Sequence, residues 1–175
     1  WHVVIGAPGT ARVPLGAFSH LLPASWEPGA DDLATWRSLA TGLGSGGGPI
    51  HLFVDDAQWL DEVSAGLVHH LVTARGAKAI VTVRRHEPVS RPITSLWKDG
   101  YLHRHDLEPL DPDQTAALLE RALGATVEPR TARLLWQRST GNLLMLRELV
   151  DAGRADGSLR LRHGAWAQAP GARPS

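Results

Sequence analysis

The stretch that most constrains the fold is residues 49–64, PIHLFVDDAQWLDEVS, in which an apolar run leads directly into two adjacent carboxylates. Residues 51–54, HLFV, are mostly apolar and favour β-structure, which is typical of a buried central strand in a parallel sheet. In open α/β sheets, ligands bind outside the carboxyl ends of such strands. The sequence therefore predicts that Asp55 and Asp56 lie where ligand chemistry takes place.

Two interpretations of this acidic pair follow from the residues. An Asp at the end of a strand can hold Mg²⁺ through its water shell, and a second carboxylate can orient or deprotonate an attacking water. The alternative is an Asx-type turn, followed by a helix that Asp61 caps. Asp61 and Glu62 suit the start of a helix in either case, because negative charge is stabilised there.

Further strands and helices are predicted on both sides of this stretch. Residues 1–6 and 79–83 are two more strands, a short helix begins at Pro14, and Asp31 or Asp32 caps another. The strand 79–83 is followed by Arg84 and Arg85. An arginine at the carboxyl end of a strand can bind a phosphate with two hydrogen bonds, but it can equally pair with surface carboxylates.

From Asp111 onwards the pattern changes from strands to helices. Asp111 and Gln114 form a capping-box pattern, and the helix that follows is predicted to turn Ala117, Leu118, Ala122 and Leu123 inward. Residues 129–139 predict a second helix, and residues 158–168 predict a β-hairpin with Gly164 in its turn. Strands alternating with helices, and then helices alone, predict a parallel α/β layer followed by a helical segment.

Two weaker sequence patterns bear on whether the chain has a metal site or a phosphate-binding loop. Residues 101–107, YLHRHDL, alternate like a strand and would place His103 and His105 on one face, but a third metal ligand is not indicated nearby. Residues 6–13, GAPGTARV, begin like a phosphate loop. Arg12 and Val13 stand where that loop needs lysine and a hydroxyl, so a working phosphate loop is not expected here.

The amino-acid composition excludes several classes of protein. The 18 basic and 18 acidic residues balance, which argues against a polyanion-binding surface over the whole molecule. The absence of cysteine excludes a disulfide scaffold and a thiolate metal site, and no apolar run has the length of a membrane span. We therefore expect a cytoplasmic protein that neither enters a membrane nor binds nucleic acid directly. Because the first residue is Trp1, we also expect a piece of a longer polypeptide or a processed one.

The ordered series VPLGAF, FVDDAQWLD, TVR and GNLL resembles the signal-transducing ATPases with numerous domains, and most of all the large ATP-binding regulators of the LuxR type, which are common in actinobacteria. The resemblance spans nearly the whole chain. It implies a partial P-loop NTPase-like core in residues 1–110, a helical lid in residues 111–153, and the start of a winged-helix-like hairpin with a disordered tail in residues 154–175. It also implies that the phosphate loop (Walker A) precedes Trp1.

The resemblance further implies a role for each site residue. The acidic pair matches Walker B, in which Asp55 would organise Mg²⁺ and Asp56 would be the catalytic residue that positions water. Thr82 and Arg84 match sensor 1, which reads the γ-phosphate of ATP. Residues 141–144 match a G-N-P-L signature near the adenine, with Gly141 and Asn142 retained and Leu143 in place of proline.

Three functional hypotheses result. The first is part of an ATP-dependent switch that controls a DNA-binding domain outside this chain, with other domains of the same polypeptide or a second copy as partners. The second is a degenerate, non-hydrolysing scaffold, which the replaced proline and the missing phosphate loop favour. The third, a DNA-binding domain in its own right, is disfavoured by the zero net charge. ATPase activity is expected at most in a longer parent, and ATP affinity of this chain is expected to be millimolar or weaker.

Overall fold

Three short strands pair in parallel and form the sheet around which the first part of the chain is built. The computed structural model describes residues 1–22, 26, 32–44 and 47–169. The chain divides into two compact units, Trp1–His105 and Asp106–Ser175. The prediction of an α/β protein with a parallel sheet is confirmed in this coarse form.

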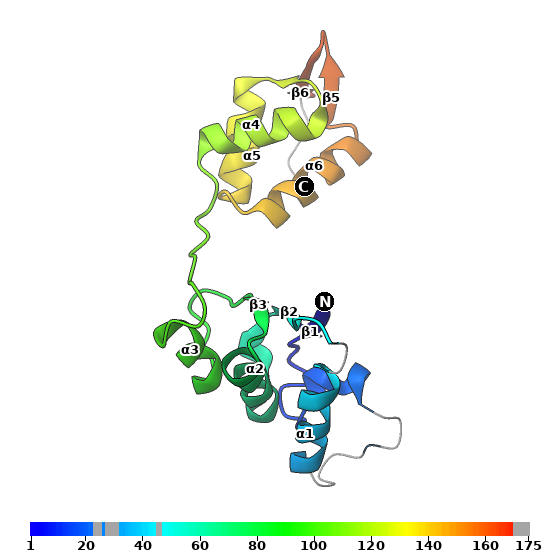
Figure 1. The fold of residues 1–175 in the computed structure, drawn as a ribbon. Helices are drawn as coiled ribbons and strands as arrows, with labels where there is room; N and C mark the ends of the chain where they lie inside the picture. Colours follow the sequence, from blue (N-terminus) through cyan, green and yellow to red (C-terminus); the bar gives the residue numbers. More distant parts are fainter. Residues whose placement is uncertain (23–25, 27–31, 45–46, 170–175) are drawn as a thin grey trace. The chain divides into compact units, whose positions relative to one another are not determined.

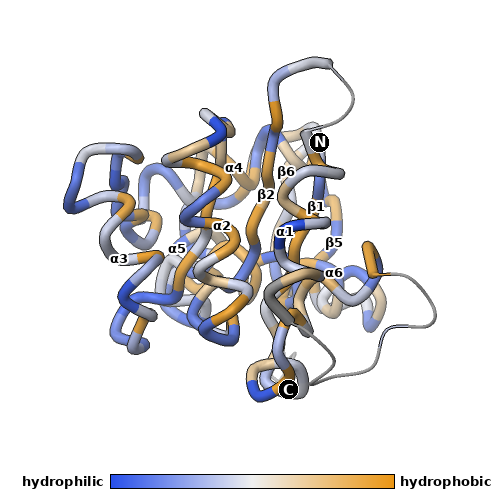
Figure 2. Tube along the Cα trace, turned by 60° about the horizontal axis from the view of Figure 1, so that its bottom comes forward, coloured by the Kyte–Doolittle hydropathy of each residue, from blue (hydrophilic) through white to orange (hydrophobic). Residues whose placement is uncertain are grey.

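The strand predicted from the acidic stretch is the middle strand of the sheet in the first unit. The order is β1 (His2–Ile5), β2 (His51–Asp55) and β3 (Lys78–Val81). β2 is strongly hydrophobic, as a strand with neighbours on both sides requires (Figure 2). The segments joining these strands contain two 3-10 helices and two α-helices, and a third α-helix follows: η1 (Gly16–Leu21), α1 (Asp32–Gly42), η2 (Ala57–Trp59), α2 (Glu62–Arg75) and α3 (Arg91–Lys98).

Local sequence explains how α2 begins and ends. The side chain of Asp61 accepts hydrogen bonds from the backbone N–H groups of Val63 and Ser64, at 3.1 and 2.9 Å, so the predicted cap is confirmed. Gly76 ends the helix at φ 65°, a left-handed conformation that glycine adopts without strain. The segment predicted as a helix from Pro14 is a 3-10 helix, η1, that begins at Gly16.

The helices of the first unit cover one face of the sheet (Figure 1). Val4, Leu52 and Val54 point into the core and are 0% exposed. Val3 and Ile80 lie in one row on the opposite face and are 46% and 53% exposed. Parallel sheets are normally covered on both faces. In the described part of the chain, this apolar face is exposed to solvent, which is unusual.

The contrast between the two faces predicts losses of stability of different size at two adjacent residues. Val4→Thr is expected to lower the free energy of unfolding of the first unit by about 1–3 kcal/mol, because it buries a hydroxyl without a partner. Val3→Thr makes the same chemical change on the open face and is expected to cost less than about 0.5 kcal/mol. Urea denaturation followed by tryptophan fluorescence measures both. Equal losses would contradict the burial of a single face.

The second unit packs three helices against a small sheet. The helices are α4 (Pro112–Leu123), α5 (Pro129–Ser139) and α6 (Leu143–Ala155), and the strands are β4 (Thr126–Val127), β5 (Leu159–Arg162) and β6 (Ala165–Gln168). The predicted hairpin is confirmed as the antiparallel pair β5 and β6, and β4 adds to β6 in parallel. The hairpin therefore belongs to the same unit as the helices.

The helix starts of this unit were well specified by sequence, but the buried face of α4 was not. The predicted capping box is confirmed: Gln114 N–H donates to Asp111 at 2.7 Å, and Asp111 N–H donates to the Gln114 side chain at 3.1 Å. α4 buries Thr115 and Leu119. The prediction that Ala117 and Ala122 point inward was wrong, since both are exposed.

The strand predicted at residues 101–107 is also wrong. This segment has no regular structure, and Leu107 is 89% exposed. Its start continues the end of α3, because Leu102 N–H donates to the carbonyl of Leu96 at 2.9 Å. A strand also needs a neighbour for its backbone groups, so alternation alone did not suffice here and the shared face predicted for His103 and His105 is not formed.

Some predictions concern residues that the structure does not describe. The helix cap at Asp31, the side chain of Asp32 and the tail at residues 170–175 lie outside the described residues. In the part of the chain that is described, no helix combines the length and the apolar character needed to cross a membrane.

Candidate functional site

The two aspartates lie at the carboxyl edge of the sheet, beside the residues that follow β3. β2 ends at Asp55, and the pairing with its neighbour continues past the end of β3. Thr82 N–H donates to the carbonyl of Val54, and Ala57 N–H donates to the carbonyl of Thr82, both at 2.9 Å. This extended pairing brings four of the predicted site residues, Asp55, Asp56, Thr82 and Arg84, to one edge of one sheet.

The hydroxyl of Thr82 links the two aspartates. It donates to Oδ1 of Asp55 at 2.6 Å and accepts from the backbone N–H of Asp56 at 2.9 Å. Because one hydroxyl has a single hydrogen to donate, Thr82 is committed to orienting Asp55. The structure thus gives Thr82 a positioning role within the protein, in addition to any contact with a phosphate.

The carboxylate of Asp56 is paired with Arg84. Nε and Nη2 of Arg84 donate to Oδ1 and Oδ2 of Asp56, each at 3.1 Å. Nε2 of Gln58 donates to Oδ1 of Asp56 at 2.8 Å. The hydrogen bonds from Arg84, and then that from Gln58, lower the pKa of the Asp56 carboxyl below its ordinary value, and the same pairing raises the pKa of the Arg84 guanidinium. Both groups are therefore charged at neutral pH.

The end of β1 packs closely against the acidic pair. Gly6 N–H donates to the carbonyl of Asp55 at 2.9 Å. A Cβ at position 6 would overlap the carbonyl oxygen of Asp56 and lie 3.2 Å from Cβ of Trp59. Only a glycine allows this approach of the two backbones, so Gly6 shapes the site.

Several backbone amides of the loop after β1 are bonded within the loop. The N–H groups of Thr10, Ala11, Val13 and Gly16 all donate to carbonyls within the loop. Leu15 N–H donates to Oδ1 of Asp61 at 3.2 Å. A phosphate loop needs backbone N–H groups directed at the anion, and these groups are bonded inside the protein instead; that residues 6–13 are not a phosphate loop stays a prediction.

Asp61 is the third carboxylate in this stretch, and its side chain is used for structure. It is 8% exposed. Besides capping α2 and accepting from Leu15, its Oδ2 accepts from the hydroxyl of Ser64 at 2.5 Å. Asp61 therefore caps α2 as predicted, whereas Asp55 and Asp56 are bonded to Thr82, Gln58 and Arg84 and take no part in that cap.

The residues present fit a magnesium ion bound in the way that Mg²⁺ is bound with nucleotides. Mg²⁺ uses one or two carboxylates, retains several waters and takes further ligands from phosphates. Asp55 is an oriented, half-buried carboxylate of this kind. Within the described ranges, no three His, Cys, Asp or Glu side chains converge, which such a site does not require.

The remaining predicted site residues lie in the second unit, at the start of α6. Gly141 adopts φ 75° and its carbonyl accepts from Leu110 N–H at 2.9 Å. Asn142 caps α6 by accepting from Met145 N–H at 3.1 Å. Leu143, by contrast, is 60% exposed. The glycine and the asparagine thus have structural roles, whereas the leucine presents an apolar side chain to solvent.

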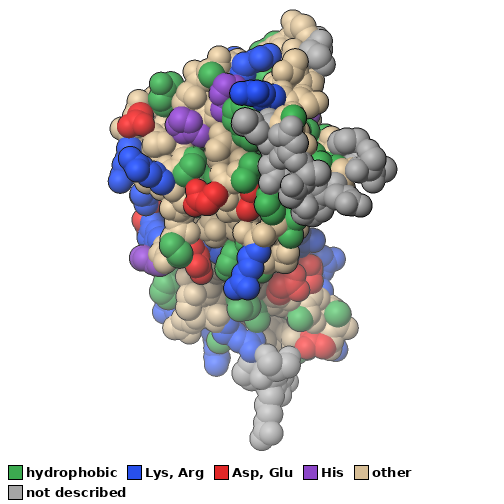
Figure 3. Space-filling model, turned by 90° about the horizontal axis from the view of Figure 1, so that it is seen from below, with side chains coloured by type: hydrophobic (Ala, Val, Ile, Leu, Met, Phe, Trp, Pro, Cys, Tyr) green, Lys and Arg blue, Asp and Glu red, His purple; other side chains and the backbone are tan. Residues whose placement is uncertain are grey.

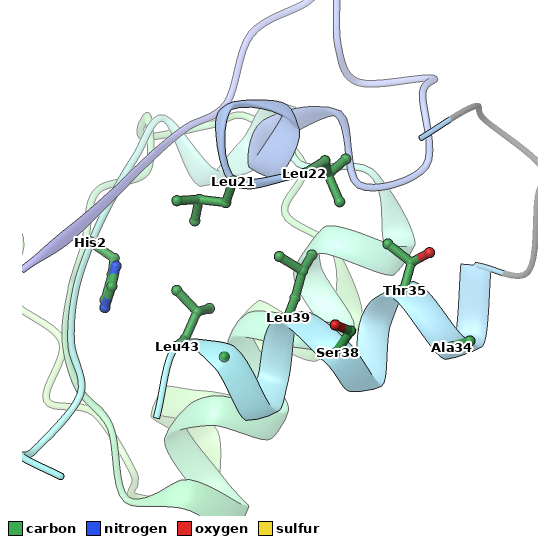
Figure 4. A pocket seen from close by; sticks show the side chains of 9 residues that line it. His2, Leu21, Leu22, Ala34, Thr35, Ser38, Leu39 and Leu43 are labelled. Atoms are coloured by element: carbon green, nitrogen blue, oxygen red, sulfur yellow. The ribbon is translucent and has the colours of Figure 1, made fainter. Parts of the chain in front are cut away.

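A cavity of about 580 Å³ lies elsewhere in the first unit, at the amino end of β1 (Figure 4). Its walls come from the start of β1, the end of η1 and one side of α1, and include His2, Leu21, Leu22, Ser38, Leu39 and Leu43. Since His2 and Asp55 lie toward opposite ends of paired parallel strands, this cavity is separate from the acidic edge.

Sequence reasoning missed two residues that shape the acidic edge, Gln58 and Gly6. Gln58 stands two residues after Asp56, but a single glutamine carries no signal of its two bonding partners. Gly6 attracted attention only through the comparison with a phosphate loop. Its close approach to Asp56 depends on the pairing of β1 with β2, which local sequence does not encode.

No protein-family model matches the chain, and no curated protein matches it either.

Proposed function

We propose that the first unit is part of an ATP-binding regulatory module, similar to that of the large LuxR-type transcriptional regulators, and that Mg-ATP binds at the carboxyl edge of its sheet. The observation that supports this most is the connected set of Asp55, Thr82, Asp56 and Arg84. These are the residue types that a Walker B and sensor 1 pair require. Hydrogen bonds join the two aspartates to Thr82 and Arg84, although the bonded residues are 26 to 28 positions apart in the sequence.

In this proposal each residue acts on the nucleotide in its own way. Asp55, held by Thr82, binds the water shell of a magnesium ion, which when bound neutralises phosphate charge. Arg84 supplies a planar pair of donors for the terminal phosphate. Asp56 orients the attacking water and accepts its proton, so hydrolysis in a longer parent protein would depend on it. The DNA-binding domain under control would lie outside this chain.

A non-hydrolysing scaffold or protein-interaction domain is the second candidate. The loop at residues 6–16 favours it, because four of its backbone N–H groups are bonded within the loop and are not directed at an anion. The open apolar face of the sheet also favours it, because such faces mark sites of contact. Direct DNA binding has less support: acidic and basic side chains are interspersed over the face in Figure 3, and the net charge is zero.

Titration of the chain with Mg-ATP, followed by ¹⁵N NMR, tests the proposal. We expect saturable shifts at the amides of Asp55, Asp56 and Arg84, with a dissociation constant near the millimolar range, equivalent to about 4 kcal/mol of binding. Asp55→Asn is expected to weaken this binding severalfold. The matched control is Asp113→Asn, which removes an exposed carboxylate from the first turn of α4.

Two results would count against the ATP-binding proposal. Shifts that Mg-ADP, Mg-ATP and adenosine all produce equally would mean that the phosphates are not recognised. A complete absence of shifts at Mg-ATP concentrations well above the millimolar range would favour the scaffold function, because the acidic edge would then have a structural role alone.

A further inference from the structure

The guanidinium of Arg84 and the carboxylate of Asp56 form an ion pair with each other. Two parallel hydrogen bonds of 3.1 Å join them, the arrangement in which an arginine also binds a phosphate. The proposed function gives these groups different partners, since Arg84 contacts a phosphate and Asp56 contacts water. In the structure the Nε/Nη2 edge of Arg84 and both carboxylate oxygens of Asp56 are engaged in this pair, so that edge cannot bind a phosphate while the pair persists.

Gln58 bonds to the carboxylate of Asp56 and to the backbone of Arg84. Its Nε2 donates to Oδ1 of Asp56 at 2.8 Å, and its Oε1 accepts from the backbone N–H of Arg84 at 3.0 Å. An amide side chain suits this position because it donates and accepts at once. A single side chain on η2 therefore ties the end of β2 to the segment after β3. We call Asp56, Gln58 and Arg84 together the clamp.

The backbone around the clamp is fixed, whereas the arginine side chain is exposed. The N–H of Asp56 is bonded to Thr82, and the N–H of Ala57 is bonded to the carbonyl of Thr82. The side chain of Arg84 is 61% exposed and that of Asp56 is 32% exposed. Exposed ion pairs contribute little to stability. An incoming anion can therefore displace the carboxylate by moving one arginine side chain, without rearranging the sheet.

We infer that Gln58 is a positioning residue that keeps the proposed nucleotide site in an off state, by holding Arg84 against Asp56. This inference rests on the proposed function. The γ-phosphate of ATP competes with Asp56 for Arg84, and transfer of the guanidinium to the phosphate frees the Asp56 carboxylate to bind water. The same movement of Arg84 thus binds the phosphate and releases the carboxylate that orients water.

The state of the clamp is measured first, without ligand. Restricted rotation of a guanidinium gives separate ¹⁵N-coupled Nη–H signals in NMR, so Arg84 in the unaltered chain is expected to show them. Gln58→Ala is expected to merge these signals, because the arginine then rotates more freely. Gln137→Ala, the same substitution at an exposed position on α5, is the matched control and is expected to leave the Arg84 signals unchanged.

The affinity for Mg-ATP is measured next, in the same variants. Gln58→Ala is expected to tighten binding about two- to fivefold, because less of the competing ion pair must be broken. A purely structural role for Gln58 would lower the melting temperature and leave the affinity unchanged or weaker. Asp56→Asn, which removes the competing charge, is expected to tighten binding at least as much as Gln58→Ala.

The outcomes separate the two proposals. Binding of Mg-ATP with equal affinity in the unaltered chain, Gln58→Ala and Asp56→Asn overturns the clamp as a regulator and leaves the proposed function standing. Absence of binding in every variant overturns the proposed function, and the off state with it. Separate Nη–H signals that persist in a folded Gln58→Ala variant overturn the positioning role of Gln58 directly.

Discussion

Gly141→Ala is expected to destabilise the second unit by more than about 3 kcal/mol, because two costs add. Gly141 lies at φ 75°, where a side chain costs roughly 1–2 kcal/mol. An added Cβ would also overlap the carbonyl oxygen of Leu110 and lie 2.8 Å from its nitrogen. These are backbone atoms, and Leu110 N–H is bonded to the carbonyl of Gly141, so neither segment can move aside without breaking that bond.

The measurement is urea denaturation, with hydrogen exchange to assign the transition to the second unit. A unit of this size has a total stability of roughly 4–10 kcal/mol, so the loss is a large fraction of it. Gly124→Ala is the matched control: it has φ 68° in the same unit, but beyond its chain neighbours no atom of the described residues lies within 4 Å of its added Cβ. It is expected to cost about 1 kcal/mol. Equal costs for the two substitutions would show that the contact with Leu110 is not tight.

This prediction affects how the role of Gly141 is tested. The resemblance to the ATP-binding regulators assigns Gly141 and Asn142 to nucleotide contact, and that assignment stays a prediction. Because both residues have structural roles at the start of α6, weaker nucleotide binding in a Gly141 variant would not distinguish a lost contact from an unfolded unit. Leu143→Ala avoids the difficulty, since its side chain is exposed and bears less on stability.

The second large effect is expected at Gly6. Its φ is not positive, so alanine fits the local backbone, and the whole cost comes from contact with Asp56 and Trp59. We expect Gly6→Ala to lower the free energy of unfolding of the first unit by about 3 kcal/mol. Because the displaced atoms belong to the backbone of Asp56, we also expect the amide signals of Asp56 and Arg84 to shift in NMR.

Gly9→Ala is the control for this substitution. It lies in the same loop, and among the residues that the structure describes, apart from its two neighbours in the chain, no atom lies within 4 Å of its added Cβ. Its effect on stability is expected to stay within about 0.5 kcal/mol, and the signals of Asp56 and Arg84 are expected to keep their positions. If Gly6→Ala behaves like Gly9→Ala, β1 does not approach the acidic pair as closely as the structure indicates.

The sequence by itself determined the features that depend on neighbouring residues. An apolar run that ends in Asp55 and Asp56 specified the central strand, and Asp61 and Asp111 specified two helix starts. At both helix starts the decisive contact lies within four residues, as when Asp61 accepts from Val63 and Ser64. The hairpin around Gly164 was equally predictable, since its turn selects its pairing.

The tertiary structure alone decided which side chains are already engaged with one another. Thr82 orients Asp55, Gln58 holds Arg84 on Asp56, and these partners come together only because β2 and β3 are paired. The same reason explains the failure at residues 101–107, whose alternation predicts a strand but which pairs with none of the described strands. Hydrogen bonds and backbone contacts between distant segments depend on the whole fold, so local periodicity and composition do not encode them.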